Sequence, residues 1–165
     1  MLSGEVVVLG GAVPTGWRSG QVDATPWGAR GVAAADPLPL SLAVGAALLG
    51  DRPHRLLAVD GSAVVLPPGA SVLVVGDGTA KRTEKAPGHF DPRAAALDDA
   101  LLAALRRGVP QDLALDGVLA RELMVEGLDV WRTVAGTVEG TFAAEVLYAA
   151  APFGVGYAVA TWIGS

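Results

Sequence analysis

Two hydrophobic patterns alternate along this chain. Short runs of β-branched and aliphatic residues are typical of buried strands, whereas apolar residues that recur every three or four positions are typical of helices packed on a sheet. The first pattern predicts strands at Glu5–Leu9, Arg55–Val59, Ala63–Leu66, Ser71–Val75, Thr141–Tyr148 and Gly154–Trp162. The second predicts helices at Leu40–Leu49, between Pro92 and Gly108, over Pro110–Val125 in two pieces that break near Gly117, and over Leu128–Val138.

This order of elements predicts the fold class. Strands that alternate with helices favour an α/β fold with a mixed, mostly parallel sheet. The last two predicted strands are separated only by a short connection around Ala151-Pro152, so we expect them to pair as an antiparallel hairpin. Residues 11–39 carry few periodic apolar positions and are predicted to form a long loop, in which Trp17 and Trp27 are candidates for a ligand wall or an interface.

Length and composition narrow the class of protein. A chain of 165 residues that is 52% hydrophobic suits a single domain over residues 1–165, with Trp131 and Trp162 inside its core. The absence of cysteine excludes disulfides, thiolate metal sites and cysteine nucleophiles. A net charge of −5 disfavours nucleic-acid binding. We expect a cytoplasmic protein that does not enter a membrane, because the sequence shows neither a signal peptide nor a long uninterrupted apolar run.

The densest polar segment of the chain, Gly76–Lys85, follows the predicted strand Ser71–Val75. Ligands of open α/β sheets bind beyond the carboxyl ends of strands, and glycines there let backbone N–H groups approach an anion closely. Both lysines of the chain, Lys81 and Lys85, lie in this segment. The segment therefore predicts a polar pocket for a small anionic or phenolic molecule. The residues expected to bind that molecule are Gly76, Gly78, Thr79, Arg82, Glu84 and Lys85.

Three residues near this pocket are candidates for catalysis. Lys81 would position the ligand, and Asp77 or His89 would move a proton. The alternative is a solvated loop whose positive charges are balanced by Asp77 and Glu84. The two histidines, His54 and His89, show no spacing typical of metal ligands, so no metal and no other cofactor is predicted.

Several motifs occur in order along the chain. They are Pro39–Gly45, Gly76–Arg82, Glu84–Gly88, Asp91–Arg93, Glu145–Tyr148 and Ala151–Trp162. Together they resemble the class III extradiol dioxygenase-like proteins of actinobacteria, and the resemblance covers about two thirds of the chain. It implies a three-layer α/β/α sandwich around a mixed sheet.

The same resemblance bears on activity. True class III extradiol dioxygenases hold Fe(II) with two histidines and one glutamate, and they use another histidine as acid and base on a catechol. By the resemblance, Ala80 stands where the family has this catalytic histidine, and alanine can neither bind a metal nor move a proton. The chain is also expected to be shortened at its N-terminus, where the family carries its first metal-binding histidine. The resemblance thus implies the scaffold without the metal or the ring cleavage.

Three hypotheses about function follow. The first is a metal-independent small-molecule-binding protein, or an enzyme of specialised metabolism, that uses a pocket within residues 76–90. The second is a non-catalytic binding or assembly protein that forms a homodimer or a larger homo-oligomer to cover a sheet edge or an apolar face. The third is an Fe(II) extradiol dioxygenase of catechols. We favour the first two together, as a homodimer with a polar pocket and no metal.

Overall fold

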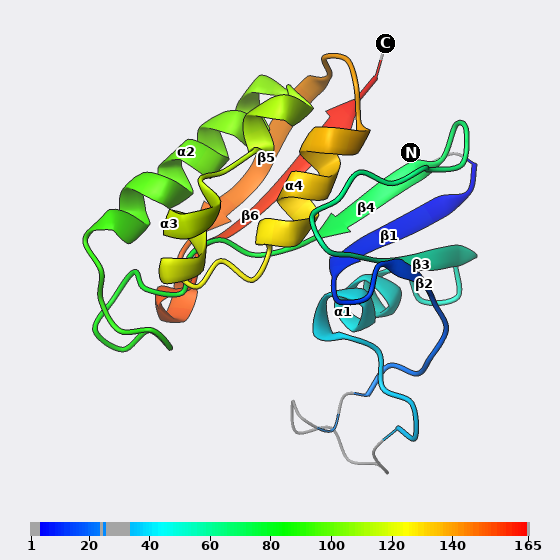
Figure 1. The fold of residues 1–165 in the computed structure, drawn as a ribbon, viewed down its shortest axis with the longest axis horizontal. Helices are drawn as coiled ribbons and strands as arrows, with labels where there is room; N and C mark the ends of the chain where they lie inside the picture. The colour runs from blue at the N-terminus through cyan, green and yellow to red at the C-terminus, as the bar shows by residue number, and fades with distance from the viewer. Residues whose placement is uncertain (1–3, 24, 26–33, 165) are drawn as a thin grey trace. The chain divides into compact units, whose positions relative to one another are not determined.

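A computed structural model describes residues 4–23, 25 and 34–164 of the chain (Figure 1). The chain divides into two compact units. The N-terminal unit comprises Met1–Asp60 and Val64–Val75, and the C-terminal unit comprises Gly61–Ala63 and Gly76–Ser165. Each unit has its own sheet and at least one helix. The mixed α/β class is confirmed, whereas the single domain stays a prediction.

The N-terminal unit is built on a four-stranded mixed sheet. Its strands are β1 (Val6–Gly11), β2 (Gly16–Arg18), β3 (His54–Val59) and β4 (Ser71–Val75), in the order β2-β3-β1-β4. β1 runs parallel to both β3 and β4, and β2 pairs antiparallel with β3 at one edge. The first four residues of β1 are buried. An unbroken apolar run of this kind is expected for a strand that is covered on both faces.

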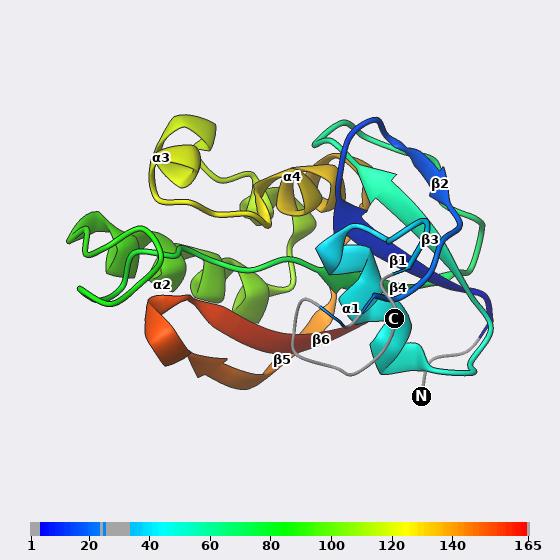
Figure 2. The same ribbon diagram turned by 90° about the horizontal axis from the view of Figure 1, so that it is seen from below.

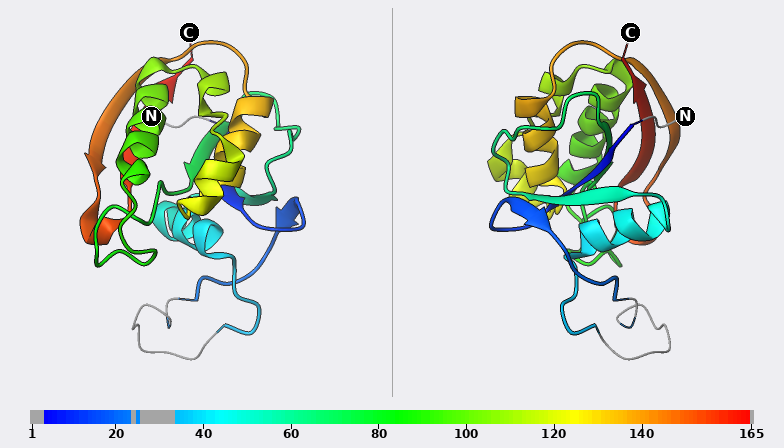
Figure 3. Two further views of the ribbon diagram at one scale, coloured as in Figure 1. Left: turned by 60° about the vertical axis from the view of Figure 1, so that its left-hand side comes forward. Right: turned by 90° about the vertical axis from the view of Figure 1, so that its right-hand side faces the viewer.

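Helix α1 (Leu40–Leu49) packs on this sheet (Figure 3). Its residues Leu42 and Ala46 belong to the same buried cluster as Val8 of β1. A Cβ atom on Gly45 would overlap the Val8 side chain, so the close approach of the helix to β1 requires glycine at this position.

The C-terminal unit combines a hairpin with helices (Figure 2). Its elements are α2 (Arg93–Arg107), α3 (Gly117–Glu122), α4 (Leu128–Thr137), the short 3-10 helices η2 (Pro110–Leu113) and η3 (Pro152–Gly154), and the strands β5 (Ala143–Ala150) and β6 (Tyr157–Ile163). β5 and β6 are antiparallel, as predicted, and form a separate two-stranded sheet. Figure 2 shows α2 alongside them, where Trp162 Nε1 donates a hydrogen bond to Leu105 O (2.7 Å).

Helical structure forms in each predicted range, although the first piece of Pro110–Val125 is only the 3-10 helix η2. α2 begins at Arg93, just after the predicted start, and Asp91 Oδ1 accepts a hydrogen bond from Arg93 N (2.9 Å) in the manner of a capping side chain. α2 ends where Gly108 takes a left-handed conformation with φ of 65°. Trp131 on α4 is buried, as predicted for a core residue. None of the helices in the described ranges is long and apolar enough to cross a membrane.

Two predictions about irregular and extended segments are wrong. The loop predicted over residues 11–39 contains β2, which pairs Trp17 with Leu57 of β3, while Trp27 lies outside the described residues. The strand predicted at Ala63–Leu66 does not form. This segment belongs to the connection between β3 and β4, which flank β1 on opposite sides, and it joins neither sheet as a strand.

Candidate functional site

The segment that follows β4 is held by backbone hydrogen bonds to the turn before β6. Gly78 N donates to Gly156 O (2.8 Å), and Gly156 N donates to Thr79 O (2.8 Å). Arg82 N donates to Gly154 O (3.0 Å). Hydrogen bonds therefore fix the backbone of this part of the segment, where the sequence predicted a pocket.

A carboxylate on helix α2 organises the same segment. Asp98 accepts hydrogen bonds from the backbone nitrogen (2.8 Å) and the hydroxyl (3.0 Å) of Thr79, and it forms an ion pair with Arg82 Nη1 (2.9 Å). The Asp98 side chain is 12% exposed, and Thr79 is fully buried. A Cβ atom at Gly78 or Gly156 would overlap the Asp98 carboxylate. Both glycines are thus required for the backbone to approach this group.

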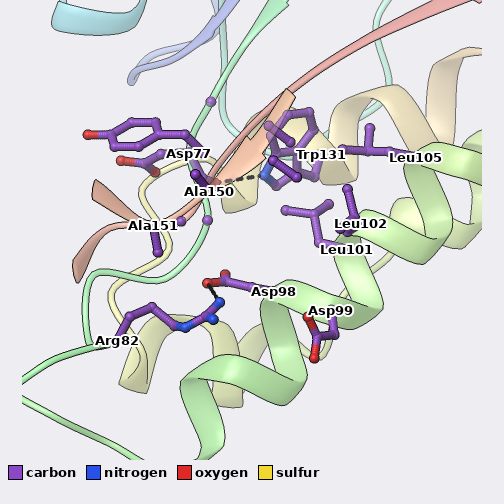
Figure 4. A pocket seen from close by; sticks show the side chains of 16 residues that line it. Asp77, Arg82, Asp98, Asp99, Leu101, Leu102, Leu105, Trp131, Ala150 and Ala151 are labelled. Carbon is purple, nitrogen blue, oxygen red and sulfur yellow. Dashed lines mark hydrogen bonds and ion pairs between the residues drawn. The ribbon is translucent and has the colours of Figure 1, made fainter. Parts of the chain in front are cut away.

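A cavity of about 150 Å³ lies in the C-terminal unit beside this carboxylate (Figure 4). Its apolar wall is formed by Leu101, Leu102, Leu105 and Trp131. Its charged groups are Asp77, Arg82, Asp98 and Asp99. Residues 149–151 and 156–158 of the hairpin complete the lining. A cavity of about 150 Å³ is large enough for one aromatic ring, so the site fits a small molecule rather than a nucleotide.

Asp77 is the acid of this cavity with a shifted pKa. Burial raises the pKa of the Asp77 carboxyl, and the negative charge of Glu126 raises it further, against the opposing effect of a hydrogen bond from Gly127 N to Asp77 Oδ1 (3.0 Å). The carbonyl oxygen of Asp77 accepts a hydrogen bond from Trp131 Nε1 (3.1 Å). The acid and the aromatic wall are therefore held in a fixed relation to each other.

The predicted site residues separate into two groups. Those that line the cavity are Gly76, Asp77, Gly78 and Arg82. Those that are not part of its lining are Thr79, Lys81, Glu84, Lys85 and His89. The structure thus brings Asp77 and Arg82 into one cavity, but it does not bring Lys81 or His89 into that cavity with them.

For Glu84, Lys85 and His89 the physical reason lies in the path of the backbone after Arg82, whereas the side chain of Lys81 lies beside Gly88. Asp91 N donates to Lys81 O (3.0 Å), and this bond folds the polar segment back on itself. Glu84, Lys85 and His89 are exposed on the returning part. Thr79 does not line the cavity for a different reason, because it is fully buried behind the Asp98 carboxylate that its hydroxyl contacts.

Sequence reasoning missed Asp98, Asp99 and the hairpin residues. Asp98 precedes Leu101 and Leu102 by three and four positions, so a helical reading places it beside the apolar stripe of α2. A carboxylate at the border of an apolar stripe was the sequence signal that could have identified Asp98 as a site residue. The hairpin contributes mainly alanines over residues 149–151, which carry no signal of a site.

The iron site of the third hypothesis, an Fe(II) extradiol dioxygenase, can be tested on the residues themselves. Ala80, which the resemblance aligns with the catalytic histidine, is buried, and its methyl side chain offers no ligand atom. Within the ranges 4–23, 25 and 34–164, no three residues among His, Cys, Asp and Glu lie together as a metal site would require. The described residues therefore do not fit the arrangement of two histidines and one glutamate.

The role of Asp98 makes a prediction about stability. Asp98→Ala leaves the two donors of buried Thr79 without their acceptor, and we expect it to lower the free energy of unfolding by about 2–3 kcal/mol. Asp99→Ala, at the exposed neighbouring position of the same helix, changes that free energy by less than about 0.5 kcal/mol. Urea unfolding followed by circular dichroism compares the two variants. Equal losses in both would contradict the role given to Asp98.

The raised pKa of Asp77 makes a second prediction. The folded protein binds the Asp77 proton more tightly than the unfolded chain does, so the carboxyl contributes stability below its ordinary pKa of 3.8. That contribution is lost as the pH rises from 3.8 through the folded-state pKa. Asp77→Asn is therefore more stable than the wild type near neutral pH, and the difference shrinks below pH 3.8. Urea titrations near neutral pH and below pH 3.8 measure the difference in the free energy of unfolding between the two proteins. A variant less stable than the wild type near neutral pH would refute the prediction.

Comparison with known proteins assigns neither a family nor a function to this chain. The chain matches no protein-family model and no curated protein. The resemblance to extradiol dioxygenase-like proteins therefore stays a prediction from sequence motifs. The cavity has to be interpreted from the residues that form it.

Proposed function

We propose that this chain is a metal-independent small-molecule-binding protein whose ligand occupies the cavity beside Asp98. The observation that carries the proposal is the cavity itself, in which a leucine wall on α2 faces charged groups on a backbone fixed by hydrogen bonds. A concave apolar site with a few converging polar groups, one of them an acid with a perturbed pKa, is the usual form of a ligand site.

Asp77 is the residue of this site suited to move a proton. Its raised pKa brings the carboxyl closer to the range in which an acid both holds and releases a proton. Arg82 is committed to Asp98 through an ion pair of 2.9 Å, so its role is to hold the wall rather than to react. If the bound molecule is converted and not only held, Asp77 is the acid or base of the reaction.

The scaffold we propose is that of the class III extradiol dioxygenase-like proteins, with the three layers that this family implies. The motif Gly76–Arg82 supports it, since this motif supplies Gly76, Gly78 and Arg82 of the cavity lining. The mixed sheet of the N-terminal unit and the antiparallel hairpin agree with such a scaffold. The absence of cysteine is compatible with a cytoplasmic location.

Ligand binding can be tested with one-ring probes in an NMR titration. We expect at least one of phenol, benzyl alcohol, benzoate and benzylamine to shift the indole N–H signal of Trp131 and the amide signals of Gly78 and Gly156. Leu102→Trp fills the cavity and abolishes these shifts. Val118→Trp, on the exposed surface of α3, leaves them unchanged. If no probe shifts the wild-type signals, the proposed function fails.

A second function, self-assembly, is supported by one face of the hairpin. Tyr148 and Val159 are cross-strand partners, and Ile163 lies on the same face as Val159 because side chains alternate along a strand. Each of these three side chains is about half exposed or more. Thr161 and its cross-strand partner Glu145 lie on the same face, so one charged position interrupts the apolar side chains. The exposed apolar side chains on either side of it favour burial against a second copy of the chain.

Self-assembly can be measured by sedimentation equilibrium. We expect the wild type to have the mass of a homodimer at micromolar concentration, and Val159→Glu to have the mass of a monomer, because the charge would be buried in the interface. Val118→Glu introduces the same charge on α3 and leaves the dimer intact. A monomeric wild type would exclude this second function.

A further inference from the structure

The balance of charge in the cavity bears on the class of its ligand. Arg82 is the one cation among the described residues that line it, and its Nη1 atom is paired with Asp98. This pair is close to neutral as a unit. Asp77 and Asp99 remain, and none of the ion pairs formed within the described part of the chain involves either of them. The lining therefore carries a net negative charge that the protein itself does not balance.

The shape and the apolar lining of the cavity give a second, independent constraint. Leu101, Leu102 and Leu105 come from successive turns of α2 and form a continuous apolar surface opposite the segment of Asp77 (Figure 4). The rings of Trp131 and Tyr157 also belong to the lining, and aromatic faces attract cations. At about 150 Å³ the space suits an apolar body of about one ring.

We infer that the cavity binds a small organic amine, with its protonated nitrogen toward Asp77 and an apolar body of one ring against the leucines and Trp131. This inference deepens the proposed function and rests on it. An anion of the same size would meet two unbalanced carboxylates, and the lysines that could attract it do not line the cavity. A neutral molecule would leave the half-buried charge of Asp77 with its hydrogen bond from Gly127 N but without an opposite charge.

Three probes with the same ring but different charge test the inference. Benzylamine is a cation at neutral pH, benzyl alcohol is neutral, and benzoate is an anion. We expect NMR titration of the wild type to give a dissociation constant for benzylamine about tenfold below that for benzyl alcohol, with benzoate the weakest of the three. Binding by no probe would refute the proposed function together with the inference. Equal or tighter binding of benzyl alcohol or benzoate would refute the amine inference alone and leave the small-molecule site standing.

Two variants separate the cavity acid from the overall charge of the protein. Asp77→Asn raises the dissociation constant of benzylamine about tenfold and changes that of benzyl alcohol by less than about twofold, because the substitution removes only the charge of Asp77. Glu145→Gln removes one negative charge from β5 at a position outside the lining, and it leaves both affinities unchanged. If Glu145→Gln weakens benzylamine as much as Asp77→Asn does, the attraction is a property of the whole protein, and the inference is wrong.

Discussion

The carboxylate of Asp98 joins helix α2 to the segment that follows β4, and the cavity takes its shape from that junction. The carboxylate satisfies two donors of buried Thr79 and pairs with Arg82. A buried hydroxyl and a buried backbone N–H group are costly without an acceptor, so these contacts hold the segment in one conformation. Glycine at positions 78 and 156 follows from the same constraint, because any side chain there would displace the carboxylate.

The site that results is amphipathic. One helix supplies both its polar and its apolar parts, since Asp98 and Asp99 are followed within two turns by Leu101, Leu102 and Leu105. Asp77 comes from the opposite segment and is fixed through the hydrogen bond between its carbonyl oxygen and Trp131. A rigid wall with one acid of raised pKa is suited to recognise a small charged molecule, because little ordering is needed when the molecule binds.

The charged residues close to Asp77 in the sequence are mostly not those that line the cavity with it. Lys81 and Lys85 stand within ten residues of Asp77 in the sequence, and they favoured an anionic or phenolic ligand. The polar segment folds back after Arg82 and carries Lys85 away, and the side chain of Lys81 lies beside Gly88, so neither lysine lines the cavity. The acids of α2 take their place, although about twenty residues separate them from Asp77 in the chain. The class of ligand therefore depends on which segments fold together.

Local patterns determined most elements of this chain by themselves. The apolar run of β1, the four-residue spacing of leucines in α2 and the short connection before β6 each predicted the correct element, because burial and periodicity are properties of neighbouring residues. Asp77, Gly76, Gly78 and Arg82 were also found in this way, from their place after a strand. Only the tertiary structure decided that Ala63–Leu66 joins no sheet and that Asp98 accepts hydrogen bonds from Thr79. Both depend on contacts between distant segments, which no local pattern encodes.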